Sequence, residues 1–141
     1  MLMTLRKKIK NQKGFTLIEL LVVISIIGVL ASIGVPKFMD TTAAARTAKV
    51  QAELGAIDSA IQIYGADHGG TMPAAIGNID SYMSGGARPT VAAGKYKIGN
   101  ATPIDVTATT YDMNTNKQAI VTLGTTTYTA ASLAAAIAAA Q

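Results

Sequence analysis

The most constraining feature of the sequence is an apolar run that follows a basic N-terminal segment and contains a single acid. Residues 15–35 carry only one charged side chain, that of Glu19, whereas residues 1–14 contain five cations and no acid. The cations are Arg6, Lys7, Lys8, Lys10 and Lys13. A helix needs about 20 apolar residues to cross a bilayer. We therefore predict a membrane anchor whose basic end stays in the cytoplasm.

Glu19 needs an explanation, because an ionised carboxylate inside a bilayer is unfavourable. Near the bilayer centre the penalty is roughly 2.5–3.5 kcal/mol on insertion scales. It is smaller near the start of the helix. Two interpretations are open: Glu19 lies at the interface beside the leader lysines and has no role, or it is paired and functional. Ionisable groups in membrane segments are functional candidates for this reason.

The positive charge of the chain belongs to its first 14 residues. The sequence has 12 Lys and Arg against 8 Asp and Glu, but from Phe15 onward seven cations face eight acids, a net charge of −1. Such a chain has no basic surface for nucleic acid, and no nucleic-acid partner is predicted. There is no cysteine, which excludes disulfides and thiolate metal sites.

One long helix is predicted from Phe15 to about Tyr64, with a weak point at Gly34 and Pro36. Proline removes a backbone donor and clashes with the preceding turn. Beyond it the pattern becomes amphipathic. The apolar stripe consists of Val50, Leu54, Ile57, Ile61 and Tyr64. The charged residues of this half are predicted to form a solvated face, namely Asp40, Arg46, Lys49, Glu53 and Asp58.

The second half of the chain has the composition of a small sheet. Turn formers fill residues 65–73, and a short helical or irregular piece is predicted at 74–83. Threonine and β-branched residues then predict strands at residues 95–98, 104–111, 119–123 and 126–129, with a hairpin at 112–117. The alanine-rich residues 130–141 predict a terminal helix. The predicted fold is α+β, with about four antiparallel strands packed on the amphipathic half of the helix.

The sequence contains no constellation that predicts an enzyme. His68 is the only histidine and lacks the partners of a catalytic or metal group, so we interpret it as an exposed turn residue. Asp112, Asn114 and Asn116 have the spacing that begins a calcium loop, but Lys117 stands where a glycine is needed. A plain hairpin turn is favoured, with calcium as the alternative. No cofactor or metal is predicted.

The residues around Gly14 resemble the type IV prepilin signature, which pseudopilins of type II secretion share. Residues 13–20 read Lys-Gly-Phe-Thr-Leu-Ile-Glu-Leu, and the apolar helix follows. The resemblance implies that a membrane peptidase cuts on the cytoplasmic side between Gly14 and Phe15 and methylates the new N-terminus at Phe15. It covers about residues 6–73. The strands beyond residue 95 match the family only in general character.

The same resemblance implies roles for side chains in the apolar helix. Glu19 would neutralise the N-terminal amine of the adjacent subunit in a filament, because two opposite charges withdrawn from water together are less costly than either alone. Gly28 and Ser32 have a spacing that lets apolar helices approach closely. Gly34 and Pro36 lie where family members show local unwinding in assembled filaments.

The resemblance divides the chain into three parts. Residues 1–14 are expected to form a basic leader that is removed, residues 15–36 an apolar helix for the membrane and the filament core, and residues 37–141 a small α+β domain. The precursor is expected to cross the bacterial cytoplasmic membrane once, with its N-terminus in the cytoplasm. The mature subunit is expected in an extracellular or periplasmic filament.

The predicted function is that of a structural subunit of a type IV pilus-like helical filament. The implied partners are other copies of the chain, the prepilin peptidase and methyltransferase, a membrane platform protein with its assembly ATPase, minor pilins, and lipid before assembly. The alternatives are a pseudopilin of a type II secretion system, a DNA-uptake pilin, and a membrane-anchored monomeric binding module.

Overall fold

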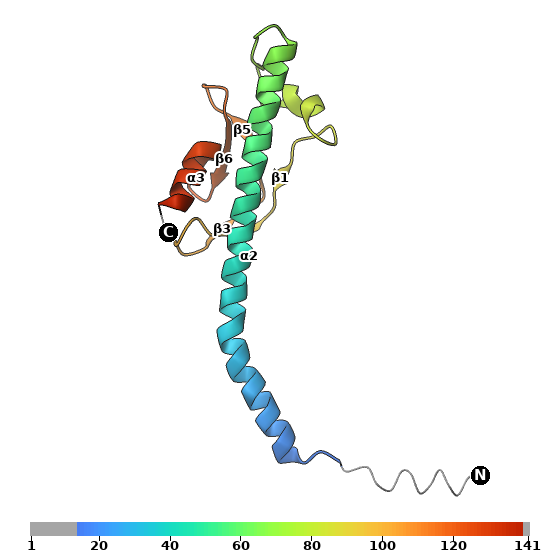
Figure 1. Ribbon diagram of the computed structural model, residues 1–141, viewed down its shortest axis with the longest axis vertical. Helices are drawn as coiled ribbons and strands as arrows, with labels where there is room; N and C mark the ends of the chain where they lie inside the picture. Colours follow the sequence, from blue (N-terminus) through green and yellow to red (C-terminus); the bar gives the residue numbers. More distant parts are fainter. Residues whose placement is uncertain (1–13, 140–141) are drawn as a thin grey trace, which may run out of the picture. The chain divides into compact units, whose positions relative to one another are not determined.

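The computed structural model describes residues 14–139 and separates into two compact units. The first, the N-terminal unit, extends to Phe38, and the second, the globular unit, begins at Met39. The predicted leader, residues 1–14, lies outside the described residues except for Gly14. Helix α2 (Leu17–Asp67) supplies the regular structure described in the N-terminal unit and the first element of the globular unit (Figure 1).

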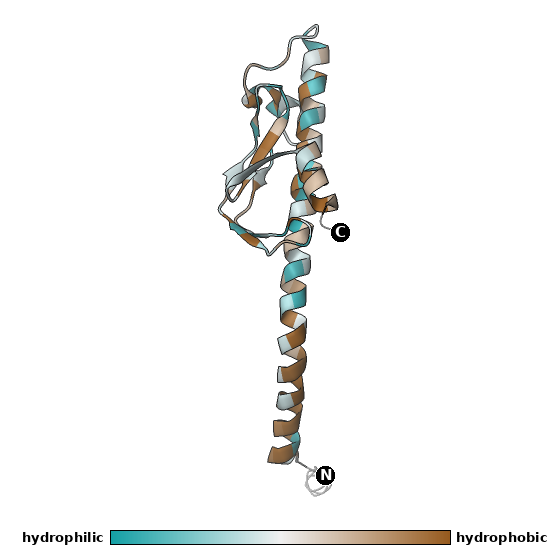
Figure 2. Cartoon of the chain, turned by 90° about the vertical axis from the view of Figure 1, so that its left-hand side faces the viewer, coloured by the Kyte–Doolittle hydropathy of each residue, from teal (hydrophilic) through white to brown (hydrophobic). Residues whose placement is uncertain are grey.

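The N-terminal unit is an apolar helix with no internal core. Every described residue from Gly14 to Phe38 is exposed, including 15 large apolar side chains. Figure 2 shows the brown of hydrophobic residues along most of this part of α2. By length and composition the helix could cross a membrane. An exposed apolar surface of this extent needs lipid or other helices to cover it.

Helix α2 continues through Gly34 and Pro36, so the predicted weak point does not divide the helix in this structure. Proline has no N–H to donate to the carbonyl of Ser32, so one helical hydrogen bond is missing. The helix also begins two residues later and ends three residues later than predicted.

The globular unit contains seven short strands, counted over the described residues, in place of the single four-stranded sheet predicted. They form three antiparallel ladders. The pairs are β1 (Thr90–Val91) with β4 (Thr109–Thr110), β2 (Gly94–Tyr96) with β3 (Ile104–Val106), and β5 (Asp112–Met113) with β6 (Ala119–Leu123), which also pairs with β7 (Thr126–Thr129). The predicted strands at 119–123 and 126–129 are confirmed, whereas the one at 104–111 is divided in two and β1 and β5 were not predicted.

Two short helices complete the unit. The 3-10 helix η2 (Ile76–Tyr82) follows the turn after α2, and α3 (Ala130–Ala138) follows β7 directly. Thr129 caps α3 through a reciprocal capping box with Ser132, which satisfies backbone donors at the helix start. Both helices agree with the predicted ranges.

The apolar stripe of α2 forms the centre of the core, as predicted. Leu54, Ile57 and Ile61 are fully buried, and Tyr64 lies at the edge. The buried cluster comprises Val50, Leu54, Ile57, Ala60, Ile61, Ile79, Val91, Tyr96, Val106, Tyr111, Ala119, Val121, Leu123 and Leu133. Burial of each large aliphatic side chain contributes about 1.5–3 kcal/mol, so this cluster is the main source of stability in the globular unit.

The predicted solvated face of α2 is in large part a docking face. Asp40 Oδ2 accepts a hydrogen bond from Lys97 Nζ at 2.8 Å, Glu53 Oε2 from Tyr111 Oη at 2.5 Å, and Asp58 Oδ1 from the backbone N–H of Ala119 at 2.6 Å. Each carboxylate therefore holds a different ladder or its flank. The predicted pair of Lys49 with Glu53 is present at 3.5 Å.

Tyr111 should make the globular unit sensitive to alkali. Burial and the hydrogen bond to Glu53 raise the pKa of Tyr111 above its ordinary value, so the unfolded chain releases this proton near pH 10 while the folded chain retains it. The stability contributed by the protonated group is complete below about pH 10 and is lost as pH rises further.

We expect Tyr111→Phe to lower stability below pH 10 by about 1–3 kcal/mol, the range for a hydrogen bond to a charged group, and to flatten the decline above it. Urea unfolding of the detergent-solubilised chain between pH 8 and 11 measures both effects. Tyr128→Phe, at a partly buried tyrosine in the same unit, is the control. Parallel stability profiles for wild type and Tyr111→Phe would contradict the assignment.

Candidate assembly site at the helix start

The first turn of α2 is closed by a reciprocal pair of side chains, Thr16 and Glu19. The Thr16 N–H donates to Glu19 Oε2 at 2.8 Å, and the Thr16 hydroxyl donates to the same oxygen at 2.7 Å. The Glu19 N–H in turn approaches Thr16 Oγ1 at 3.3 Å. This is a capping box, with Thr16 as the N-cap and Glu19 three residues later.

The capping box explains how the chain tolerates Glu19 in an apolar segment. The first N–H groups of a helix have no partner within the helix, and in lipid an unsatisfied backbone group costs several kcal/mol. Glu19 accepts one such donor and also gains from the positive end of the helix dipole. The acid that looked misplaced in the sequence therefore stabilises the start of the helix that contains it.

The cap leaves Glu19 accessible to a further partner. Glu19 is exposed, and it lines an open groove of about 380 Å³ with Phe15, Ile18, Val22 and Val23. Its Oε2 accepts both bonds from Thr16, so the carboxylate has remaining acceptor capacity for an ammonium group. Phe15 is 90% exposed and precedes Thr16 directly. Residues 14 and 15 are exposed and lie outside the helix.

The other predicted site residues lie on the exposed surface of α2. A Cβ added at Gly28 or Gly34 would meet nothing within 4 Å, so neither glycine is required by a contact within the chain. Ser32 donates its hydroxyl to the carbonyl of Val29 at 2.7 Å. Ser25, which the sequence reasoning did not single out, does the same to Leu21 at 2.8 Å. Both hydroxyls are thus satisfied without water.

Thr16 is the functional candidate that the sequence reasoning missed. The signal is present in the sequence, since Thr16-x-x-Glu19 before an apolar run is the capping-box pattern.

His68 and the residues with the spacing of a calcium loop both form local contacts. His68 stacks on Tyr64 with ring centroids 3.9 Å apart, and Tyr82 meets both rings edge-on. Asp112 accepts from the N–H of Met113, and Asn114 exchanges two hydrogen bonds with Gln118 across the hairpin. Within the described residues no group of three or more His, Cys, Asp or Glu side chains could hold a metal ion.

Loss of the cap should fray the start of α2. We expect Thr16→Val, which removes the hydroxyl, to destabilise the first turn by about 1 kcal/mol and to raise amide exchange at residues 17–19 in detergent micelles by about five-fold. Thr16→Ser retains the cap and is the control. Unchanged exchange in Thr16→Val would show that the pair does not hold the helix start.

The segment that contains this site matches a known family model. The family model described as the prokaryotic N-terminal methylation motif matches residues 9–35. The chain is 37% identical over 111 residues to the type IV major pilin protein PilE of Neisseria gonorrhoeae, a match that covers 76% of this chain and 61% of that protein.

Two further relatives match over shorter stretches. The fimbrial protein EcpB of Eikenella corrodens is 51% identical over 60 residues, 43% of this chain and 37% of that protein. The type IV major alpha-pilin of Moraxella bovis is 50% identical over 50 residues, 36% and 31% of the two chains. The chain therefore spans from about a third to about three fifths of the length of the curated relatives it matches.

No solved structure matches the chain with significance. The fold, a long N-terminal helix followed by small antiparallel ladders, is consistent with that of type IV pilins. The chain matches the prokaryotic N-terminal methylation motif at residues 9–35 and is similar to proteins named type IV pilins and fimbrial proteins.

Proposed function

We propose that this chain is the precursor of a structural subunit of a type IV pilus-like helical filament. The observation that carries the proposal is an exposed apolar helix that begins at a methylation motif and holds one capped acid, Glu19, in its first turn. The names of the relatives, type IV pilins and fimbrial proteins, support a structural rather than an enzymatic role.

The proposal gives each part of the N-terminal unit a task. Cleavage between Gly14 and Phe15 removes the basic leader and creates a free amine, which is methylated at Phe15. The apolar helix holds the subunit in the cytoplasmic membrane and later packs with the same helix of other copies. Gly28 and Ser32 are proposed helix contacts, because small side chains permit close approach, and Gly34 with Pro36 marks a place where assembly could loosen the helix.

Glu19 is the proposed register contact between subunits. In the isolated chain its carboxylate caps its own helix, and in the filament it pairs with the N-terminal amine of a neighbour. The exposed second oxygen and the adjoining groove support this pairing, since both ions leave water together. The prepilin peptidase, the platform protein, the assembly ATPase and minor pilins are the partners that this pathway requires.

A type II secretion pseudopilin remains the alternative within the same architecture. It would be processed and assembled by the same contacts, so the N-terminal unit does not separate the two. The relatives are named for pili and fimbriae, which favours the pilus. Electron micrographs of material sheared from the native cells should show long fibres that contain this chain, whereas fibres confined to the periplasm would favour secretion.

Replacement of Glu19 by glutamine separates the two roles of this side chain. Glutamine retains the capping geometry but cannot pair with an ammonium group, and leaving one buried charge unpaired costs roughly 3–5 kcal/mol. We expect Glu19→Gln to be inserted and cleaved normally while sheared filaments fall at least ten-fold in immunoblots. Glu19→Asp, which keeps the charge on a shorter side chain, should restore part of the yield. Filaments of normal abundance from Glu19→Gln would refute the pairing.

Replacement of Gly14 tests the cleavage site. A peptidase that needs close approach to the backbone should reject a side chain at this position, so we expect Gly14→Leu to accumulate as the uncleaved precursor. Intact mass spectrometry should show the full leader and no methyl group. Gly28→Ala, another glycine with open space around it, should be processed normally. A product that begins at Phe15 in Gly14→Leu would contradict the assignment.

A further inference from the structure

A shallow apolar groove lies at one end of the globular unit. It has a volume of about 360 Å³ and lies between the β2–β3 loop and the β6–β7 turn. Ile98, Ala101 and Ile104 line one side. Leu123, Thr125 and Tyr128 line the other. The lining includes exposed Thr125 at the tip of the β6–β7 turn.

Contacts with α2 fix the level of this groove along the helix. The N–H of Lys97, next to Ile98, donates to Thr47 Oγ1 at 3.1 Å and lies 3.3 Å from the carbonyl of Ala43. The groove therefore lies beside the first turns of α2 that belong to the globular unit. In Figure 1 the β3 label stands at this end of the unit and the turn after α2 at the other.

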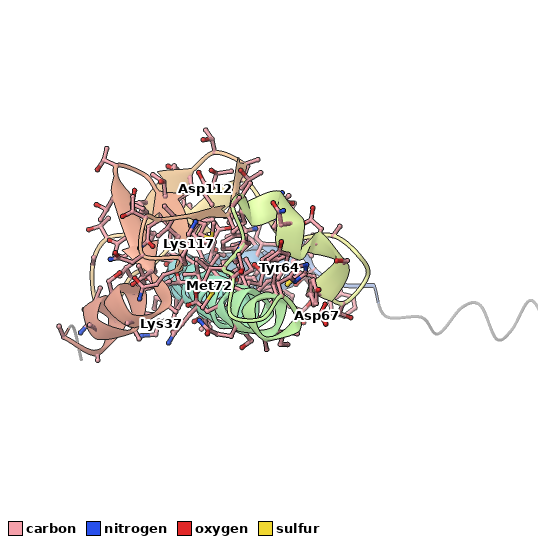
Figure 3. All side chains as sticks on the ribbon, turned by 90° about the horizontal axis from the view of Figure 1, so that it is seen from above. Lys37, Tyr64, Asp67, Met72, Asp112 and Lys117 are labelled. Atoms are coloured by element: carbon pink, nitrogen blue, oxygen red, sulfur yellow. The ribbon has the colours of Figure 1, made fainter. Side chains whose placement is uncertain are left out.

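The opposite end of the unit presents one large apolar side chain on a loop. Residues 68–73, the distal loop, fold back over the end of α2, where Met72 Sδ lies close to Gly65. Lys117 Nζ holds the loop by a 3.0 Å hydrogen bond to the carbonyl of Pro73. Met72 is still 37% exposed, and Figure 3 looks onto this end. Thr47 and Gly65 are separated by about 27 Å along the helix.

Few large apolar side chains of the globular unit are exposed. Among its described residues the exposed large hydrophobic side chains are Met39, Ile63 and Met72. Met39 adjoins the boundary with the N-terminal unit, and Ile63 lies on the regular helix. Met72 is the one carried by a loop. Its flexible thioether side chain adapts well to irregular pockets.

The two ends also differ in charge. At the groove end the ion pairs Lys49–Glu53, Lys95–Asp105 and Lys97–Asp40 balance, and Arg46 has no carboxylate partner among the described residues. At the distal end Arg88 pairs with Asp80, which leaves three acids against one cation. These are Asp58, Asp67 and Asp112 against Lys117. The groove end is therefore positive and the distal end negative.

We infer that, in the filament, the groove of one copy receives the distal loop of a second copy, with Met72 as the apolar anchor. The inference rests on the proposed function. Opposite charge at the two ends favours this head-to-tail approach and disfavours contact between two like ends. Because the two surfaces are different, the contact is heterologous, and a heterologous contact that does not close into a ring repeats without limit along a fibre.

The absence of native cysteine makes cross-linking a direct test. The full chain carrying Met72→Cys and Thr125→Cys is assembled in the native cells, and sheared filaments are oxidised and separated on non-reducing gels. Each copy would be bonded to one neighbour through position 72 and to another through position 125. We expect a ladder that extends well beyond the dimer, whereas either single variant stops at the dimer or the monomer.

The control pair is Met72→Cys with Ser59→Cys, because Ser59 is exposed on α2 away from the groove lining. A ladder from the Thr125 pair and none from the Ser59 pair supports the contact. Filaments without a ladder from the Thr125 pair, or equal ladders from both pairs, would overturn it. If the unaltered chain forms no filaments in micrographs, the proposed function fails, and that result is distinct from filaments that lack the cross-link.

A second variant decides the matter if the cysteine pair does not assemble. Ala101→Trp fills the groove, and Ala92→Trp adds the same side chain at an exposed position outside it. We expect both proteins to keep the wild-type unfolding midpoint and to be cleaved normally, and filament yield to fall at least ten-fold only for Ala101→Trp. Wild-type yield from a folded Ala101→Trp variant would overturn the inference.

Discussion

Burial of the apolar stripe of α2 is the interaction on which the rest of the globular unit depends. The strands are two to five residues long and form three separate ladders, and isolated two-stranded ladders are marginal in water. They persist because their inward residues, such as Val91, Val106 and Val121, meet Leu54, Ile57 and Ile61 in one core. The three ladders have little contact with one another, and α2 provides the surface on which all of them pack.

The carboxylates of α2 fix where each ladder lies along the helix. Apolar contact is not directional, so the stripe alone would not place each ladder along the helix. Asp40, Glu53 and Asp58 do so, because each accepts a short hydrogen bond from a different segment. Hydrogen bonds with an ionised acceptor are stronger than neutral ones. Near the N-terminus, Glu19 likewise accepts a hydrogen bond from a backbone N–H, that of Thr16. This bond satisfies a donor at the start of a helix that is suited to an apolar environment.

The parts of the structure that could be predicted are those whose signal is local. The helical spacing of the stripe, the alternation in β6 and β7 and the alanine-rich α3 all depend on residues within one or two turns. The predictions were wrong where the structure depends on residues that are distant in the sequence. Glu53 and Asp58 look solvated in the sequence, because Tyr111 and Ala119 lie about 60 positions away. The strand predicted at 104–111 is divided because its two parts pair with different segments, β2 and β1.

The sequence by itself determined the apolar helix, its single acid, the methylation motif and the succession of a long helix, short strands and a terminal helix, because hydrophobic period, charge and motif spacing are properties of neighbouring residues. Only the tertiary structure decided that the strands separate into three ladders and that Asp40, Glu53 and Asp58 each hold a different segment. It also placed a groove and Met72 at opposite ends of one unit. These features depend on contacts between residues that are distant in the sequence, and a local sequence pattern does not predict such contacts.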